Sequence, residues 1–129
     1  MKLKILLVDS EMLFTKIIKN ILLIKEYEIE EAGNGYEGLQ KAKNKHFDLV
    51  ISNVFLTQVS GLEFINRYKN EVNNTTPIFV ISKSSDKNLE SAVFDLGAAN
   101  FITIPMNLYK LFKKVKELET DRKAFLINQ

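Results

Sequence analysis

Five short aliphatic runs, each followed by a stretch with helical spacing, are the feature that most constrains what this chain can fold into. Residues 3–8 are almost wholly aliphatic and end at Asp9, and residues 48–53 have a similar aliphatic centre. A run that does not alternate polar with apolar residues is typical of a strand covered on both faces. The remaining strands are expected at 28–32, 77–82 and 100–104. Strands that alternate with helices through short connections predict right-handed βαβ units and a parallel sheet.

Apolar spacing and capping residues predict the helices between these strands. Residues 12–24 carry apolar side chains three and four positions apart, Gly97 is a natural helix terminus, and a strongly amphipathic last helix follows Pro105. The apolar stripe of the first helix comprises Leu13, Phe14, Ile17, Ile18, Ile21, Leu22 and Ile24. Two N-cap pairs, Asn34 with Glu37 and Ser60 with Glu63, open helices at 35–45 and from 60 to about 71.

The length of the chain allows one domain. With 129 residues it has room for a single hydrophobic core and no second folded unit. The order of elements predicts a doubly wound, flavodoxin-like (βα)5 fold whose parallel sheet has the strand order 2-1-3-4-5. We expect residues 1–121 to form this domain and residues 122–129 to extend the last helix or begin a linker.

The composition excludes several kinds of site. Because cysteine is absent, the chain cannot form disulfides, thiol nucleophiles or Fe–S clusters, and a single histidine, His46, cannot build a His-rich metal site. A net charge of +2 does not indicate a nucleic-acid or membrane surface. The aliphatic run before Asp9 is too short for a signal peptide, and no apolar run approaches the roughly 20 residues of a membrane span. We therefore expect a cytoplasmic protein that binds neither membranes nor nucleic acid.

Polar side chains gather where the predicted strands end. Parallel sheets of this kind bind ligands at the carboxyl ends of their strands, beside the point where the strand order reverses. The residues at this edge are Asp9, Ser10 and Glu11 after the first strand, Asn53 after the third, Ser82 and Lys83 after the fourth, and Ile104 with Pro105 after the fifth. This edge is the predicted functional site.

Four motifs at these strand ends resemble, in order and spacing, the receiver domain of two-component response regulators. They are residues 4–9 with their acidic end, residues 47–53 followed by Ser60, Gly61 and Leu62, residues 77–82 with their final hydroxyl, and residues 97–105 from Gly-Ala to Pro. The resemblance covers residues 2–120. It implies the same fold and a place in bacterial phosphorelay signal transduction.

The residues that carry the family's chemistry are replaced in this chain. In the family, two adjacent acids and the acceptor aspartate hold Mg²⁺, the aspartate takes the phosphoryl group, and a lysine after the fifth strand pairs with that group. The matching residues here are Asp9, Ser10, Asn53 and Ile104. An amide cannot act as the carboxylate nucleophile, serine removes an anionic ligand, and isoleucine cannot neutralise phosphoryl oxygens. The resemblance with these departures predicts weak or absent Mg²⁺ binding and no phospho-acceptor at position 53.

The rest of the responsive scaffold is retained. Ser82 and Phe101 match the family's switch hydroxyl and switch aromatic residue, and the family's bond before the residue matching Pro105 is cis. Two interpretations of the acidic pocket stay open: Asp9 and Glu11 hold a cation weakly, or Asp9 or Ser10 caps the first helix.

We expect a degenerate receiver that acts as a phosphorylation-independent protein-interaction module and is not an enzyme. Family practice implies a partner or attached effector domain at the fourth helix, fifth strand and fifth helix. The expected contact residues are Lys87, Glu90, Phe94, Tyr109, Lys110 and Lys113. Two alternatives remain: a small flavodoxin-like nucleotide or flavin binder, and a working receiver phosphorylated at Ser52 or Ser82.

Three weaker signals have ordinary structural explanations beside functional ones. Residues 33–38 match G-x-G-x-x-G, but they follow an edge strand, so a turn with a capped helix start is favoured over a dinucleotide site. His46 is expected at the surface. In the last helix, the stripe Leu111, Val115, Leu118, Arg122 and Phe125 has three interpretations: a linker helix toward an output domain, the seam of a homodimer, or core packing of its first three residues with a frayed end.

Overall fold

The computed structural model describes residues 2–127, without the side chains of residues 12–14. The strands are β1 (Lys4–Val8), β2 (Glu28–Ala32), β3 (Leu49–Asn53), β4 (Ile78–Ser82) and β5 (Asn100–Thr103). The helices are α1 (Met12–Ile24), α2 (Gly35–Asn44), α3 (Gly61–Arg67), α4 (Lys87–Asp95) and α5 (Leu108–Ile127), with a π-helical turn, η1 (Tyr68–Val72), after α3. The predicted fold class is confirmed, because all strand pairs are parallel and their order is β2-β1-β3-β4-β5.

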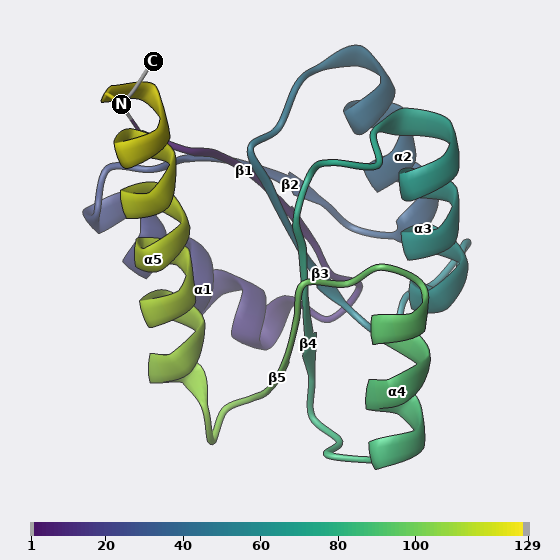
Figure 1. Ribbon diagram of the computed structural model, residues 1–129. Helices are drawn as coiled ribbons and strands as arrows, with labels where there is room; N and C mark the ends of the chain where they lie inside the picture. The colour runs from purple at the N-terminus through teal and green to yellow at the C-terminus, as the bar shows by residue number, and fades with distance from the viewer. Residues whose placement is uncertain (1, 128–129) are drawn as a thin grey trace.

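Helices cover the sheet on both faces (Figure 1): α1 and α5 lie on one side, and α2, α3 and α4 lie on the other. Each face has its own buried cluster, one that includes Leu6, Val50 and Phe64 and one that includes Ile5, Ile51 and Val115. Neighbouring residues of one strand therefore pack into opposite clusters, which explains why the central strands read as unbroken aliphatic runs.

The predicted caps organise the helix starts. The side chain of Asn34 accepts a hydrogen bond from the Glu37 amide at 2.8 Å, and that of Ser60 accepts one from the Glu63 amide at 3.2 Å. Gly97, which follows α4, has a φ of 106°, a backbone conformation that favours glycine. The Ile104–Pro105 peptide bond is cis, as the resemblance implied.

The start of α1 differs from the expectation. Neither Asp9 nor Ser10 caps this helix: its N-cap is Glu11, which makes no side-chain capping hydrogen bond. The Asp9 carboxylate accepts from the Glu11 backbone amide just ahead of the first turn. Of the predicted apolar stripe, Ile18 and Leu22 are buried, but Ile17 is exposed and Ile24 is 81% exposed. The stripe is therefore narrower than predicted; the side chains of Leu13 and Phe14 lie outside the described residues.

The last helix is continuous from Leu108 to Ile127 and is anchored along much of its length. Leu111 and Val115 are buried, and Leu118 packs against the same cluster. Further along, the Arg122 guanidinium lies 3.0 Å from the Asp48 carboxylate. This part of the stripe packs on its own domain, whereas Phe125, the last residue of the stripe, is exposed. Within the described residues, no helix is long and apolar enough to cross a membrane.

Candidate functional site at the strand ends

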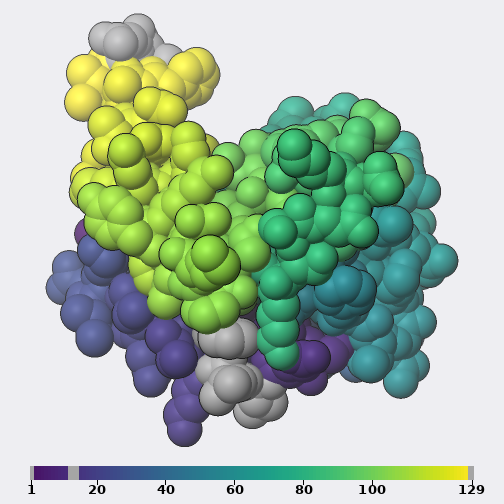
Figure 2. Space-filling view, turned by 90° about the horizontal axis from the view of Figure 1, so that it is seen from below, coloured from purple at the N-terminus to yellow at the C-terminus, as the bar shows by residue number. Residues whose placement is uncertain are grey.

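The predicted strand-end residues do come together at the carboxyl edge of the sheet, which is the lower edge in Figure 1. Figure 2 looks onto this edge from below, where the teal-green segment at the end of β4 touches the purple segment that follows β1. Direct contacts link Asp9 to Asn53, Ser10 to Thr57, and Glu11 to Lys83. The cluster therefore joins three loops: those after β1, β3 and β4.

Asp9 is the buried carboxylate at the centre of this site, with 5% of its surface exposed. Its Oδ1 accepts hydrogen bonds from the Glu11 backbone amide at 2.9 Å and from the Asn53 side-chain amide at 3.2 Å. Its Oδ2 accepts one from the Thr15 hydroxyl. Burial raises the pKa of Asp9 above its ordinary value, and these three donors counteract that rise in part.

Asn53 uses both ends of its amide. The side chain is 4% exposed; its Nδ2 donates to Asp9, and its Oδ1 accepts from the Phe55 backbone amide at 2.9 Å. The amide nitrogen carries no charge, but it donates a hydrogen bond to the buried Asp9 carboxylate. The amide oxygen holds the start of the loop after β3. An aspartate at this position would present a second carboxylate to Asp9.

Ser10 and Glu11 tie the loop after β1 to its two neighbours. The Ser10 hydroxyl oxygen accepts from the Thr57 backbone amide at 3.0 Å, and the two hydroxyl groups lie 3.2 Å apart. The Glu11 carboxylate pairs with the Lys83 ammonium, and both side chains are about half exposed. Ser10 thus links the loop after β1 to the loop after β3.

The switch position is also bound within its own loop. Ser82 is fully buried, and its hydroxyl oxygen accepts from the Ser84 amide at 3.0 Å. The Ser84 hydroxyl in turn accepts from the Asp86 amide at 3.2 Å, and Asp86 caps α4 through the Asn88 amide at 2.7 Å. This succession of hydrogen bonds orders the chain from the end of β4 to the start of α4.

Phe101 and Ile104 belong to the core and not to a polar site. Both are buried, Phe101 in the cluster beneath α2, α3 and α4, and Ile104 in the cluster beneath α1 and α5. Ile104 therefore brings no polar group to the strand ends, and Pro105 beyond it is exposed.

These residues do not fit a Mg²⁺ ion. Hard divalent cations prefer several anionic or carbonyl oxygens, whereas Asn53 points amide hydrogens at Asp9 and Ser10 is a neutral hydroxyl. Both oxygens of Asp9 already accept hydrogen bonds, and the Glu11 carboxylate is paired with an ammonium. In residues 2–127, no three acidic or histidine side chains are grouped as a metal site.

The remaining candidates lie away from this cluster. The expected partner residues are exposed on α4 (Lys87, Glu90, Phe94) and α5 (Tyr109, Lys110, Lys113). His46 is a surface residue whose Nε2 lies 3.3 Å from the Asp48 carboxylate. The sequence reasoning missed Thr15 and Thr57 as partners of Asp9 and Ser10; a hydroxyl one helical turn after Glu11 was the available signal for Thr15.

The glycines of the G-x-G-x-x-G motif serve packing. A Cβ on Gly35 would lie 2.4 Å from the Val59 carbonyl oxygen, and one on Gly38 would lie 2.9 Å from the Phe64 ring. The adjacent pocket of about 250 Å³ is lined by the acidic side chains of Asp9, Glu31 and Glu37, which would repel phosphate groups.

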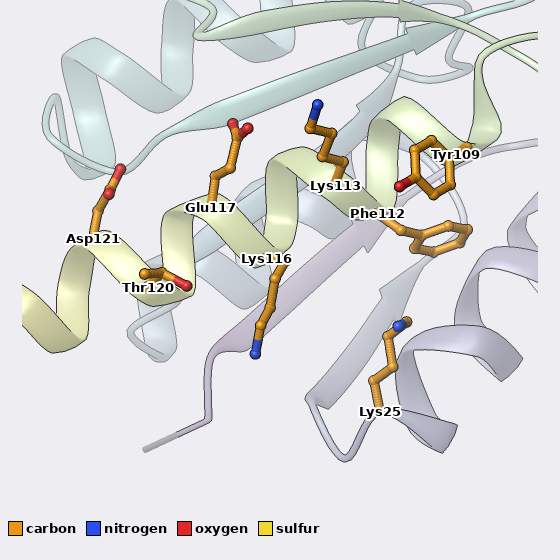
Figure 3. A pocket seen from close by; sticks show the side chains of 8 residues that line it. All are labelled: Lys25, Tyr109, Phe112, Lys113, Lys116, Glu117, Thr120 and Asp121. Atoms are coloured by element: carbon orange, nitrogen blue, oxygen red, sulfur yellow. The ribbon is translucent and has the colours of Figure 1, made fainter.

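A groove of about 500 Å³ lies elsewhere, between α5 and the end of α1 (Figure 3). Tyr109 and Phe112 form its apolar part, and Lys25, which directly follows α1, faces them. Its rim mixes cations with the acids Glu117 and Asp121, so its charge selects no class of ligand.

Known proteins resemble this chain in sequence and in fold. The family model of the response regulator receiver domain matches residues 5–116. The chain is 30% identical over 115 residues to response regulator ArlR of Staphylococcus saprophyticus and 27% identical to ArlR of Staphylococcus aureus. These matches cover 89% of this chain but 51% and 52% of the relatives, so the chain spans about half of their length.

Solved structures of response regulators have a similar fold. The chemotaxis response regulator CheY4 of Vibrio cholerae superposes with a TM-score of 0.84 at 26% identity, over 92% of this chain and 99% of that chain. Response regulator TrrA of Thermotoga maritima, solved in complex with Mg²⁺ and BeF, superposes with a TM-score of 0.80 at 30% identity and the same coverage.

Proposed function

Because this chain belongs to the response regulator receiver family, we propose that it is a two-component signalling module that works without phosphorylation of its strand-end site. The observation that carries the proposal is the hydrogen bond from the Asn53 amide to the buried Asp9 carboxylate. It places a neutral donor, already engaged, where the family has its acceptor aspartate.

Phosphoryl transfer at this site lacks three of its parts. Formation of an acyl phosphate requires a carboxylate nucleophile, and an amide nitrogen whose lone pair is delocalised is a poor substitute. Ile104 supplies no cation for the developing charge, because it is buried among apolar residues. The residues present do not favour Mg²⁺. We therefore regard the chain as a binding module without enzymatic turnover.

The expected binding surface consists of α4, β5 and α5. Its exposed side chains include the aromatic residues Phe94 and Tyr109 and charged residues on both helices. Aromatic residues within a charged surround are typical of protein interfaces. The partner is a separate protein or an effector domain in the same polypeptide, as the greater length of the curated relatives suggests.

The alternative functions have less support. Ser52 and Ser82 are almost fully buried, and the Ser52 hydroxyl donates to the Asn53 carbonyl at 3.0 Å, so a phosphodonor would have to open the fold to reach either. A nucleotide or flavin would meet the carboxylates beside Gly33 and the packed glycine Gly35.

The test is treatment with acetyl phosphate and Mg²⁺ followed by intact mass measurement. We expect no phosphoryl adduct, whereas a receiver with an intact acceptor aspartate, treated in parallel, should gain one. A stoichiometric adduct that hydroxylamine removes would be an acyl phosphate and would overturn the proposal.

A further inference from the structure

We propose that Lys83 is a positioning residue whose ammonium group pairs with the Glu11 carboxylate and so joins the loops after β1 and β4. The inference rests on the proposed function, since it explains how these loops are held when neither a metal nor a phosphoryl group binds. The residue has no counterpart among the family positions described above.

The contact itself spans the site. Lys83 directly follows the buried Ser82 at the end of β4, and it pairs with Glu11, which lies 72 positions earlier and opens α1. The pair therefore joins two loops across the mouth of the pocket. The Glu11 carboxylate is available for this pair, because the hydrogen bonds to the buried Asp9 come from Thr15, Asn53 and the backbone amide of Glu11.

The rest of the β4–α4 loop is ordered from within. The hydrogen bonds from Ser84 to Ser82, from Asp86 to Ser84 and from Asn88 to Asp86 fix its local shape. They do not attach it to the loop after β1, which the Lys83–Glu11 pair does. A loop with a fixed shape and a fixed attachment sets the position at which α4 begins, and α4 carries part of the expected partner surface.

The expected size of the effect of breaking the pair follows from the solvent exposure of the Lys83 and Glu11 side chains. Both side chains are about half exposed, and such ion pairs contribute little to global stability. Loss of the pair should therefore speed amide exchange through local opening of the β4–α4 loop by up to about fivefold. The melting temperature of the whole domain should barely change.

The experiment measures amide hydrogen exchange by NMR at Ser84, Asp86 and Asn88. We expect Glu11→Lys and Lys83→Glu each to speed exchange two- to fivefold, and the double variant Glu11→Lys/Lys83→Glu to return it to the wild-type rate, because the pair is restored with its signs reversed. Lys87→Glu, an exposed lysine one helical turn further on, is the matched control and should leave these amides unchanged.

Salt and a charge-conserving variant provide two further readouts. One molar NaCl should speed exchange in the wild type but not in Lys83→Met. Lys83→Arg keeps the positive charge and should exchange as the wild type does.

The proposal is overturned if the double variant exchanges as fast as the single variants, or if one molar NaCl leaves exchange in the wild type unchanged. A phosphoryl adduct on the wild-type protein would instead overturn the proposed function and leave the exchange result standing, so the two failures are distinguishable.

Discussion

At the scale of single residues, Asn53 shows how a side-chain amide can satisfy a buried carboxylate. A buried carboxylate needs donors, and Asp9 obtains one of its three from the Asn53 side chain. An aspartate at position 53 would remove this donor and place a second buried carboxylate beside Asp9. It follows that Asn53→Asp alone should cost stability.

Asn53→Asp should lower the free energy of unfolding by about 1–3 kcal/mol at pH 7.5, because Asp9 loses a donor and gains a like charge. The new carboxyl has its folded-state pKa raised by this neighbour, so the penalty is present above that pKa and is relieved as the pH falls through it. Urea unfolding at pH 7.5 and pH 5 measures both effects.

The control for this prediction is the exchanged pair Asp9→Asn/Asn53→Asp. It keeps one amide and one carboxylate at the same contact and should recover much of the lost stability. If the single variant is as stable as the wild type, or if the exchanged pair recovers nothing, the hydrogen bond from Asn53 to Asp9 does not have the role assigned to it.

At the scale of elements, the hydrogen bonds and backbone angles at the ends of the helices help to specify where each helix stops. Helix α1 ends in two reverse hydrogen bonds, from the Tyr27 amide to the Leu22 carbonyl at 3.1 Å and from the Glu26 amide to the Leu23 carbonyl at 2.9 Å. This arrangement requires a left-handed residue, and Glu26 has a φ of 69°. A side chain with a Cβ is strained there.

Glu26→Gly should therefore stabilise the protein by about 0.5 kcal/mol. Relief of left-handed strain gains about 1–2 kcal/mol, and the greater freedom of glycine in the unfolded chain takes back about 0.4–1 kcal/mol. Lys25→Gly, at a neighbouring residue with a φ of −81°, has no strain to relieve and should destabilise. Equal effects of the two substitutions in thermal unfolding would contradict this account.

Helix α5 is fixed to the domain by a buried acid as well as by apolar residues. Glu119 is 1% exposed; its Oε1 lies 2.9 Å from the Lys116 ammonium, and its Oε2 lies 3.8 Å from that of Lys2. Burial by itself raises the pKa of Glu119, but the hydrogen bond and charge of Lys116, with the charges of Lys2 and Lys123, outweigh it and leave the pKa below its ordinary value. Oε2 has no hydrogen-bond partner among the described residues.

Glu119→Gln should destabilise the protein by about 1–2 kcal/mol at pH 7, since a charged partner is removed from a buried position. Because the folded-state pKa is depressed, this contribution is present above the ordinary value near 4.5 and is lost as the pH falls through the folded pKa. The gap between variant and wild type should thus close on acidification in denaturant unfolding.

Glu117→Gln is the matched control, because Glu117 is exposed and pairs with Lys114 at 3.3 Å. It should change stability by less than about 0.5 kcal/mol. Should the two variants behave alike at pH 7, the burial of Glu119 would have no energetic consequence.

At the scale of the whole molecule, stability should be graded across the sheet. Every residue of β3 and β4 is buried, and β1 lies between β2 and β3. In the edge strand β2, by contrast, Glu28 is exposed and the next three residues are half-buried. Elements with fewer buried contacts open by local fluctuation, and those at the centre open with the whole domain.

We therefore expect the amides of Leu7, Ile51 and Val80 to exchange only through global unfolding, and that of Glu30 to exchange at least tenfold faster. Native-state hydrogen exchange with increasing urea measures this, since globally exchanging amides share the slope of the unfolding transition. Equal protection across all five strands would mean that the domain opens as one unit.

The sequence by itself determined the strand order, the caps of α2 and α3, the turn at Gly97 and the amide at the end of β3. These depend on local chemistry, on the period of the apolar pattern and on residue identity at a strand end, all of which can be read along the chain. The tertiary structure decided which loops meet, and so it alone paired Glu11 with Lys83, Ser10 with Thr57 and Asp9 with Thr15.

It also decided which apolar and charged side chains are covered. Ile24 belongs to the same apolar spacing as Leu22 but is exposed, and Glu119 lies in a charged helix but is buried. Periodicity specifies a face of a helix, whereas burial depends on the length and tilt of the surface against which that face packs, and those are properties of the assembled domain.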